Sequence, residues 1–234
     1  MNKTTAMLIV LCWLFIPEQG FAQKKMTYGV GVDIFQTKLN NVDRENFSGY
    51  GHSMPGFTQN DQLGFGATFL AQTPIYKNLS FETGLGITNF NSQFHFMYYD
   101  QIRSDSVNTK LNISLFYFKV PILISYSFPM NSRSLISLSL GSDLRFLFLS
   151  KDNFDEINNY FINLGNNRYR LFIPCVKAGI KYTSKLKSNK VFETEFFIGK
   201  DLNRIMTFRW GFYENLSTAS YLNYGLSLKY FFTK

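Results

Sequence analysis

The chain is poor in the residues from which metal sites and disulfide scaffolds are built. Its 234 residues include two cysteines and two histidines, too few for a zinc cluster or a set of structural disulfides. Charged residues account for only 17% of the chain, a share too low for a disordered protein. Beyond the amino terminus its apolar runs, such as residues 120–124, stop at a handful of residues, whereas a membrane-spanning helix needs about 20. We therefore expect no metal, no cofactor and no helical membrane anchor in the body of the chain.

Aromatic residues and basic charge are plentiful by contrast. The chain holds 26 Phe and 14 Tyr and carries a net charge of +8. A nucleic-acid-binding protein would gather such charge on one face beside stacking aromatic residues, and we expect no nucleic-acid partner here. The basic excess lies in short connections and near the two termini instead, at Lys24, Lys25, Lys77, Arg133, Lys185, Lys187, Lys190 and Lys234. We expect it to mark one rim of the molecule, next to lipid headgroups.

The first 22 residues have the composition of a secretory signal peptide. Lys3 gives a basic start, residues 7–16 form an apolar core, and Gly20 and Ala22 offer small side chains before a cleavage point. The pattern predicts export across the inner membrane and removal of this segment. Residues 23–234 then form a single domain.

The exported part of the chain alternates apolar and polar residues with a period of two, which places every second side chain on one face of a strand. In the first such segment Tyr28, Val30 and Val32 share one face, and Gly31 and Asp33 share the other. The pattern occurs eight times, over residues 28–34, 63–69, 79–87, 119–128, 136–146, 172–182, 192–199 and 222–232. Eight strands are therefore predicted.

The connections between these segments alternate between short and long. Short turns are expected near residues 73–78, 129–134 and 184–190, and long polar stretches near 36–62, 98–110, 150–169 and 200–220. Outer-membrane barrels have short periplasmic turns and longer extracellular loops. The sequence therefore predicts an all-β fold: an eight-stranded antiparallel up-and-down transmembrane β-barrel with this arrangement of loops.

The two faces of the predicted strands differ in a way that favours a membrane barrel over a soluble one. A soluble ligand-binding barrel would turn its apolar face inward, and alternation alone does not decide between the two. Here the polar face carries glycine and charge, which suit a narrow lumen filled by side chains. Its charged residues are five acids and five bases, predicted to form a lumen charge network: Asp33, Glu82, Lys119, Asp143, Arg145, Lys177, Lys181, Glu193, Glu195 and Lys229. Equal numbers favour a salt-bridged plug, because a buried charge needs a partner; a proton or ion relay is the alternative.

One segment changes its pattern part-way. Leu111, Ile113, Leu115 and Tyr117 lie at odd positions, whereas the apolar residues from Val120 onward lie at even positions. A β-bulge or a change of environment is expected between them. The strand is predicted to project above the bilayer here, in a hairpin whose other strand carries Phe94, Phe96 and Tyr98.

These segments resemble the small outer-membrane β-barrel proteins of Bacteroidetes-type bacteria, the PorT-like or porin-family barrels. Residues 118–126, Phe-Lys-Val-Pro-Ile-Leu-Ile-Ser-Tyr, look like that family's aromatic-x-x-Pro-Leu-Leu-x-x-Tyr strand, and residues 73–86 look like its second turn and third strand. The resemblance implies location in the outer membrane of a Gram-negative bacterium. It also suggests a role as an accessory of a type IX secretion or gliding apparatus.

The end of the chain resembles the assembly signal read by the barrel insertion machinery. The residues that carry this resemblance are Gly225, Leu226, Leu228, Tyr230 and Phe232. The chain departs from the pattern by adding Thr233 and Lys234 after the final aromatic residue. The resemblance implies the barrel assembly machinery and outer-membrane lipid as partners.

Catalysis is not expected. Some small barrels are hydrolases that place a histidine and a serine two residues apart on a strand, because the serine needs a positioned base. Here His52 is followed directly by Ser53, and His95 has no such serine. The acidic residues within 152–156 lack the spacing of a calcium loop, and Cys175 is expected to be inert packing in the lumen.

The remaining candidate for function is the set of long connections. They carry aromatic residues that are typical of recognition surfaces but that packing within the loops explains equally well: Phe47, Tyr50, Phe57, Phe154, Tyr160, Phe161, Phe208, Trp210, Phe212 and Tyr213. The hypothesis is a non-catalytic integral outer-membrane protein with a structural or interaction role, whose extracellular loops contact an envelope protein. The alternatives are the secretion accessory and a narrow porin-like channel.

Overall fold

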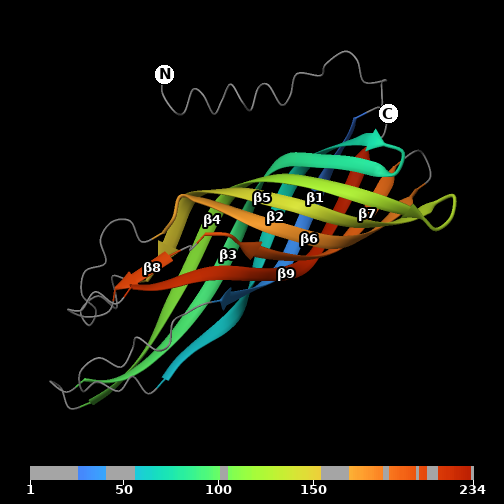
Figure 1. Ribbon diagram of the computed structural model, residues 1–234. Helices are drawn as coiled ribbons and strands as arrows, with labels where there is room; N and C mark the ends of the chain where they lie inside the picture. The colour runs from blue at the N-terminus through green and yellow to red at the C-terminus, as the bar shows by residue number, and fades with distance from the viewer. Residues whose placement is uncertain are drawn as a thin grey trace, which may run out of the picture.

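The computed structural model describes residues 26–40, 56–100, 105–153, 169–186, 190–203, 206–209 and 216–232. Its strands are β1 (Thr27–Asn40), β2 (Gly56–Tyr76), β3 (Leu79–Asp100), β4 (Asp105–Pro129), β5 (Ser134–Asp152), β6 (Phe172–Lys185), β7 (Val191–Asp201), β8 (Met206–Arg209) and β9 (Leu216–Phe232). Strands β1 to β7 and β9 pair with their neighbours, and β1 pairs with β9 (Figure 1). This closes an eight-stranded antiparallel barrel, as the sequence predicts. The four-residue strand β8 pairs with β9 and is not part of the closed ring.

The pairing of the strands keeps the two predicted faces apart. Ile34 of β1 lies beside Phe65 of β2 and Leu226 of β9. Asp33, one residue away, is paired with Gly66 and Ser227 on the opposite face. Antiparallel partners share a face, so the apolar and polar sets each run continuously around the barrel.

The apolar face is on the outside. Leu140 and Phe196 are 63% and 67% exposed, whereas the side chains of Lys181 and Glu195 are fully buried. A protein in water would not expose so many large apolar side chains while burying its ions. Within the described residues no helix is long and apolar enough to cross a membrane.

Aromatic residues border the outer apolar band at both ends. At the end with the short turns, the rings of Tyr126 and Phe128 lie 5.0 Å apart. At the other end, the ring of Phe118 lies 4.4 Å from that of Phe148. Phe118 and Tyr126 are both on β4, eight residues apart, which is about 27 Å along a strand and about 21 Å across a bilayer at a strand tilt of about 40°. The band is close to the thickness that outer-membrane barrels present to lipid.

The predicted short turns near residues 73–78 and 129–134 are confirmed, and they lie at one end of the barrel. The third falls there too, between the end of β6 at Lys185 and the start of β7 at Val191, and its residues 187–189 lie outside the described residues. The connection between β4 and β5 is held by Asn131, whose Oδ1 accepts hydrogen bonds from the backbone N–H of Arg133 and of Ser134, each at 2.8 Å. An asparagine side chain commonly stabilises a turn in this way.

The opposite end differs from the prediction. Residues 98–110 were expected to form a long loop, but β3 continues to Asp100 and β4 begins at Asp105, so a long hairpin replaces the loop. The pairing of Phe94 with Leu111 confirms the predicted hairpin extension. The expected loop at 36–62 is also shorter, because β1 runs to Asn40 and β2 begins at Gly56.

Strands β2, β3 and β4 continue beyond their neighbours as a three-stranded sheet of residues 56–61, 92–100 and 105–112, which we call the projecting sheet. The last pair between β1 and β2 is Thr37 with Gln62, and the last between β4 and β5 is Ile113 with Asp152. Figure 1 shows the three strands running past the others at the lower left.

The change of pattern in β4 is a change of environment and not a bulge in that strand. Ile113, Tyr117 and Lys119 are all buried on the same inward face. The register shift lies in the opposite strand, where Phe116 pairs with Leu149 and Tyr117 with Leu147. The lumen is therefore lined by apolar residues at this end and by ions below it.

The lipid-facing orientation predicts the effect of an outward charge. We expect Leu140→Arg, in the middle of β5, to lower the free energy of unfolding in lipid vesicles by about 2–4 kcal/mol. The matched control is Leu171→Arg, at an exposed site on the rim beyond the aromatic border, where the cost falls to about 0–1 kcal/mol. Denaturant titration in vesicles measures both. Equal stabilities of the two variants would contradict an apolar band in contact with lipid.

Candidate functional site

The lumen contains all ten charged residues that the sequence predicts to face the axis, and each of them is buried. Six strands and the closing strand supply them, with two each from β5, β6 and β7. Six of them form a central cluster near the short-turn end. Lys119, Asp33 and Arg145 take part in two ion pairs nearer to the projecting sheet, and Asp143 has no ion pair among the described residues.

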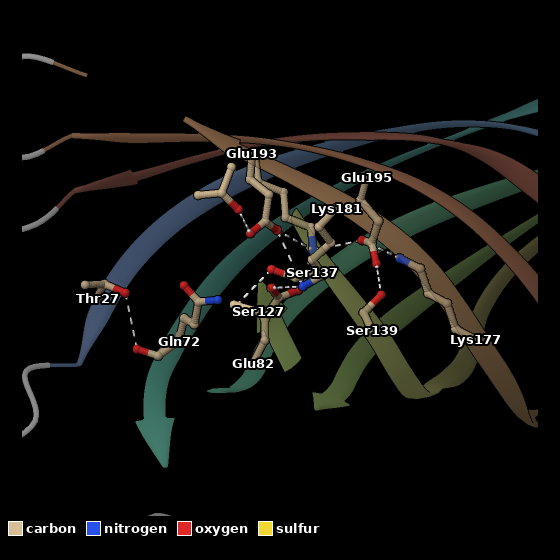
Figure 2. A network of polar contacts seen from close by, with 12 residues as sticks. Thr27, Gln72, Glu82, Ser127, Ser137, Ser139, Lys177, Lys181, Glu193 and Glu195 are labelled. Carbon is tan, nitrogen blue, oxygen red and sulfur yellow. Dashed lines mark hydrogen bonds and ion pairs between the residues drawn. The ribbon is translucent and has the colours of Figure 1, made fainter. Parts of the chain in front are cut away.

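The central cluster is organised around Glu82 of β3. One carboxylate oxygen accepts a hydrogen bond from Lys181 Nζ at 2.8 Å, and the other accepts one from Lys229 Nζ at 2.6 Å. Lys229 also lies 2.9 Å from Glu195 and 3.4 Å from Glu193. Figure 2 shows Glu82, Lys181 and Glu195 directed toward one another from different strands inside the barrel.

Hydroxyl groups and a further lysine complete the cluster. Ser139 Oγ donates to Glu195 at 2.6 Å, and Thr183 Oγ1 donates to Glu193 at 3.2 Å. Lys177 Nζ lies 3.3 Å from the second oxygen of Glu195. A buried carboxylate is stable only when its lone pairs are occupied in this way, so each of these short polar residues has a structural role.

Two ion pairs lie nearer to the projecting sheet. Lys119 Nζ bonds Asp33, and Arg145 bonds Asp201 at 2.6 Å. Asp201 is absent from the predicted network because it falls within the expected loop at 200–220. It is the last residue of β7, and continuing the alternation of Glu193 and Glu195 would have placed it on the inward face.

With Asp201 included, the lumen holds six acids and five bases. Asp143 is the acid without an ion pair among the described residues, and its Oδ1 has no hydrogen-bond partner there. It lines a cavity of about 20 Å³ together with Lys119, Lys177 and Asn223. That volume fits about one water molecule. A second cavity, of about 10 Å³, lies beside Glu82 and Leu123.

An aromatic layer covers the ions on the side of the projecting sheet. The ring of Phe90 stacks on Tyr221 with centroids 5.6 Å apart and meets Tyr117 edge-on at the same distance. The guanidinium of Arg145 lies 4.5 Å above the ring of Phe90, in a cation–π contact. The sequence did not predict this layer.

Phe35 belongs to the same layer, 4.9 Å from Phe90, and two glycines make room for it. Gly64 and Gly225 pair with Phe35 from either side. A Cβ atom at Gly64 would lie 2.3 Å from the Phe35 ring, and one at Gly225 would lie 2.5 Å from Phe35 Cβ. Large aromatic residues beside strand glycines are a known way of filling such gaps.

Apolar side chains also lie among the ions in the half of the lumen nearer the short turns. Leu70 and Leu123 are buried and line the second cavity together with Glu82. Phe231 is buried near the end of β9 and packs over Gly29, whose Cβ would lie 2.7 Å from its ring. The described part of the lumen is therefore filled by side chains around two small cavities.

The residues considered for chemistry are not assembled into a site. His52 and Ser53 lie outside the described residues, as do Asp155 and Glu156. In the part of the chain that the structure describes, no group of three His, Cys, Asp or Glu residues could hold a metal ion. Cys175 is buried beside Arg145, with its Sγ 3.5 Å from the carbonyl oxygen of Val176.

The predicted assembly signal lies on β9, the strand that closes the barrel. Leu228 and Phe232 are exposed on the lipid face, and Leu226 and Tyr230 are partly exposed on it. The glycine at position 225 is also explained by packing, because it leaves room for Phe35 on the neighbouring strand. Recognition of these residues by an assembly machinery stays a prediction, and the predicted signal peptide lies outside the described residues.

An apolar exterior with aromatic borders and a polar interior are the combined features of outer-membrane β-barrels. The chain is built as an integral outer-membrane β-barrel. No protein-family model matches it, and neither does any curated protein sequence. The family resemblance drawn from the sequence is therefore not confirmed.

Comparison with solved structures finds similar proteins at low identity. OprG of Pseudomonas aeruginosa, an outer membrane protein, is 12% identical over 89% of this chain and 95% of its own, with a TM-score of 0.48. The outer membrane protein AlkL in DMPC bilayers is 10% identical over 93% and 95%, with a TM-score of 0.43. Ail of Yersinia pestis is 9% identical over 89% and 99%, with a TM-score of 0.38. Similarity at this level assigns no function.

The central cluster predicts a large effect of removing one carboxylate. Glu82→Ala leaves Lys181 and Lys229 each short of a partner in a buried site, which costs about 3–5 kcal/mol of folding free energy. Glu82→Gln keeps an acceptor and should be intermediate. Lys151→Ala, an exposed site, should change stability little. Denaturant titration in vesicles measures all three, and an unchanged or raised stability of Glu82→Ala would show that the cluster does not hold the lumen together.

Proposed function

We propose that this protein is a non-catalytic component of the outer membrane of a Gram-negative bacterium. Its barrel is closed to solutes, and its projecting sheet and long connections bind a partner in the envelope. We assign its export to the cleaved signal peptide predicted for residues 1–22. The observation that carries the proposal is the contrast between the two parts of the molecule: the lumen is filled by buried side chains, most of its ions in pairs, while three strands continue beyond the lipid band.

The filled lumen supports a closed barrel over a narrow channel. A channel needs a wetted path, whereas the described lumen holds small cavities of about 20 and 10 Å³. Apart from Asp143, the charged groups that could line a pore are bound to one another, at distances such as 2.6 Å for Arg145 and Asp201. Opening a path would require several of these pairs to separate together.

The outer face of the projecting sheet supports its exposure to water. Along β3 this face carries Leu85 and Ile87 within the lipid band, then Asn91 and Gln93 above it. The amide of Gln93 accepts a hydrogen bond from Asn60 at 3.0 Å and donates one to Asn112 at 2.8 Å. Such an amide ladder would be unfavourable in lipid. Because this end lies opposite the short turns, we assign it to the cell exterior.

The secretion or gliding accessory is the second candidate. The strand motif at residues 118–126 supports it, because that motif resembles PorT-like barrels. Two of these residues also have a structural role in the barrel: Lys119 bonds Asp33, and Phe118 lies at the aromatic border. The partner bound by the projecting sheet would separate this role from a free-standing one.

The closed lumen predicts that the protein conducts no ions across a membrane. Purified protein in a planar bilayer should give no steady conductance. Phe90→Ala should also remain silent, because the ion pairs below the aromatic layer still fill the lumen. Steady openings of the wild-type protein, scaling with the number of inserted molecules, would overturn the closed-barrel assignment in favour of the channel.

The interaction role predicts position-dependent cross-linking in living cells. A photo-reactive amino acid at Lys110, exposed on the projecting sheet, should attach a specific envelope protein on illumination. The same residue at Lys185, exposed at the end with the short turns, is the matched control and should not attach that protein. Mass spectrometry identifies the attached protein, and a secretion component would favour the accessory role. The absence of any specific product from the projecting sheet would contradict an interaction role.

A further inference from the structure

The short turns at one end of the barrel carry basic residues and no acid. Residues 73–78, 129–134 and 184–190 contain five lysines and arginines and neither aspartate nor glutamate. The acids nearest to them in sequence, Glu82 and Glu193, are buried in the lumen, where they bind lysines. Four of the five bases lie in the described residues and are exposed, and we call them the basic rim: Lys77, Arg133, Lys185 and Lys190.

Backbone hydrogen bonds hold the basic rim together. The carbonyl oxygen of Arg133 accepts a hydrogen bond from the N–H of Lys185, and that of Lys190 accepts one from Leu186, each at 2.8 Å. The carbonyl oxygen of Asn78, in the first turn, accepts one from the backbone of β4 at 2.8 Å. Like charges are thus kept close together, and within the described part of the chain no acid pairs with them. An anion from outside the chain would relieve their repulsion.

The basic rim lies at the depth of lipid headgroups. Phe192 pairs with Tyr230, whose ring lies 5.1 Å from that of Phe232 at the aromatic border. Lys190 is two residues before Phe192, which is about 7 Å along a strand and about 5 Å along the membrane normal at a tilt of about 40°. The headgroup layer beside the hydrocarbon core is about 5–8 Å thick. The rim cations therefore reach the level of the phosphates.

Exposed apolar side chains lie among the bases of the rim. Tyr76 and Met130 are 63% and 60% exposed, and Ile75 and Leu186 are exposed as well. The ammonium of Lys77 lies 5.9 Å from the centroid of the Tyr76 ring. A membrane interface suits such a mixture, because it offers phosphates to the cations and an apolar layer to the other side chains. A polyanionic cell-wall polymer would match the charge alone.

We infer that the basic rim binds anionic phospholipid of the periplasmic leaflet, such as phosphatidylglycerol, in preference to zwitterionic phospholipid. Each base beside an anionic headgroup favours that lipid by about fivefold. The opposite end lacks this feature, because its bases are mixed with acids, as Lys151 is with Asp152. The leaflet named here rests on the orientation given under the proposed function, whereas the preference for anionic lipid does not depend on it.

The test measures which lipids contact the barrel in phosphatidylcholine vesicles. Electron spin resonance gives the fraction of spin-labelled phosphatidylglycerol, or of spin-labelled phosphatidylcholine, whose motion the protein restricts. The expected result is a preference of about twofold for phosphatidylglycerol, because only the lipids beside the rim gain about fivefold. The preference should disappear at an ionic strength of about 1 M, where the Debye length is about 3 Å.

Two variants with the same change of charge separate the rim from net charge. The rim variant should bind the two lipids equally, and the control variant, altered at exposed sites of the opposite end, should keep the preference. The rim variant carries Lys77→Gln, Arg133→Gln, Lys185→Gln and Lys190→Gln. The control variant carries Lys38→Gln, Lys110→Gln, Lys151→Gln and Lys200→Gln. The gel shift of the heated against the unheated barrel verifies folding. An equal preference in the two variants, or none in the wild type, would overturn the lipid-binding rim.

Sedimentation with purified cell-wall sacculi tests the competing partner. The wild-type protein in phosphatidylcholine nanodiscs should stay in solution, because the inference assigns the rim to lipid. Pelleting that is lost in the rim variant and retained in the control variant would assign the rim to the cell wall, and the inference would be wrong.

Cysteine labelling in cells separates this inference from the proposed function. Lys190→Cys should react with a membrane-impermeant maleimide only after the outer membrane is permeabilised, whereas Lys151→Cys should react on intact cells. Cys175 is buried in both variants. Reaction of Lys190→Cys on intact cells would contradict the periplasmic leaflet and the orientation in the proposed function. The expected labelling without a lipid preference would remove the lipid-binding rim alone, and the interaction role would stand.

Discussion

The pairing of acids with bases inside the barrel is the constraint on which the rest of the structure depends. Lipid surrounds the strands, so a charged side chain can avoid it only by turning inward. Once inward, it must find a partner of opposite charge, because an isolated buried ion is very unfavourable. Glu82 meets this requirement by binding Lys181 and Lys229 together. The small residues, the serine and threonine hydroxyls and the aromatic layer are arranged around those pairs.

The barrel and its inward charges could be predicted from the sequence because strand alternation is strict and local. The face on which Lys181 lies can be predicted from the residues immediately before and after it, and no distant partner has to be known. The acid that Lys181 binds could not be predicted. Glu82 lies 99 positions away in the sequence, and which acid comes close to Lys181 depends on the register of the strands around the barrel. Asp201 was missed because a polar stretch after Gly199 favoured a loop, although alternation extended two residues further.

The aromatic layer and the projecting sheet were only partly predictable for a related reason. Phe35 interrupts a face otherwise made of glycine and aspartate, and its place is explained only by Gly64 and Gly225 on the two neighbouring strands. In the segment around Tyr117 the sequence shows that the apolar residues change from odd to even positions, but it does not show why. Polar composition favoured a loop at residues 98–110, whereas the pairing of β3 with β4 keeps the described part of this region extended as far as Asp100 and Asp105. Contacts between distant segments decided each case.

The position of Lys229 has a consequence for how the molecule is assembled. It lies on β9, which comes last among the strands of the barrel in chain order, and its ammonium bonds the carboxylate of Glu82, 147 residues earlier. Neither group has this partner until the seam between β1 and β9 joins. Pairing of β1 with β9 and formation of this buried ion pair thus occur together. The closed barrel is therefore stabilised by β9 in two ways, through its backbone pairing and through Lys229.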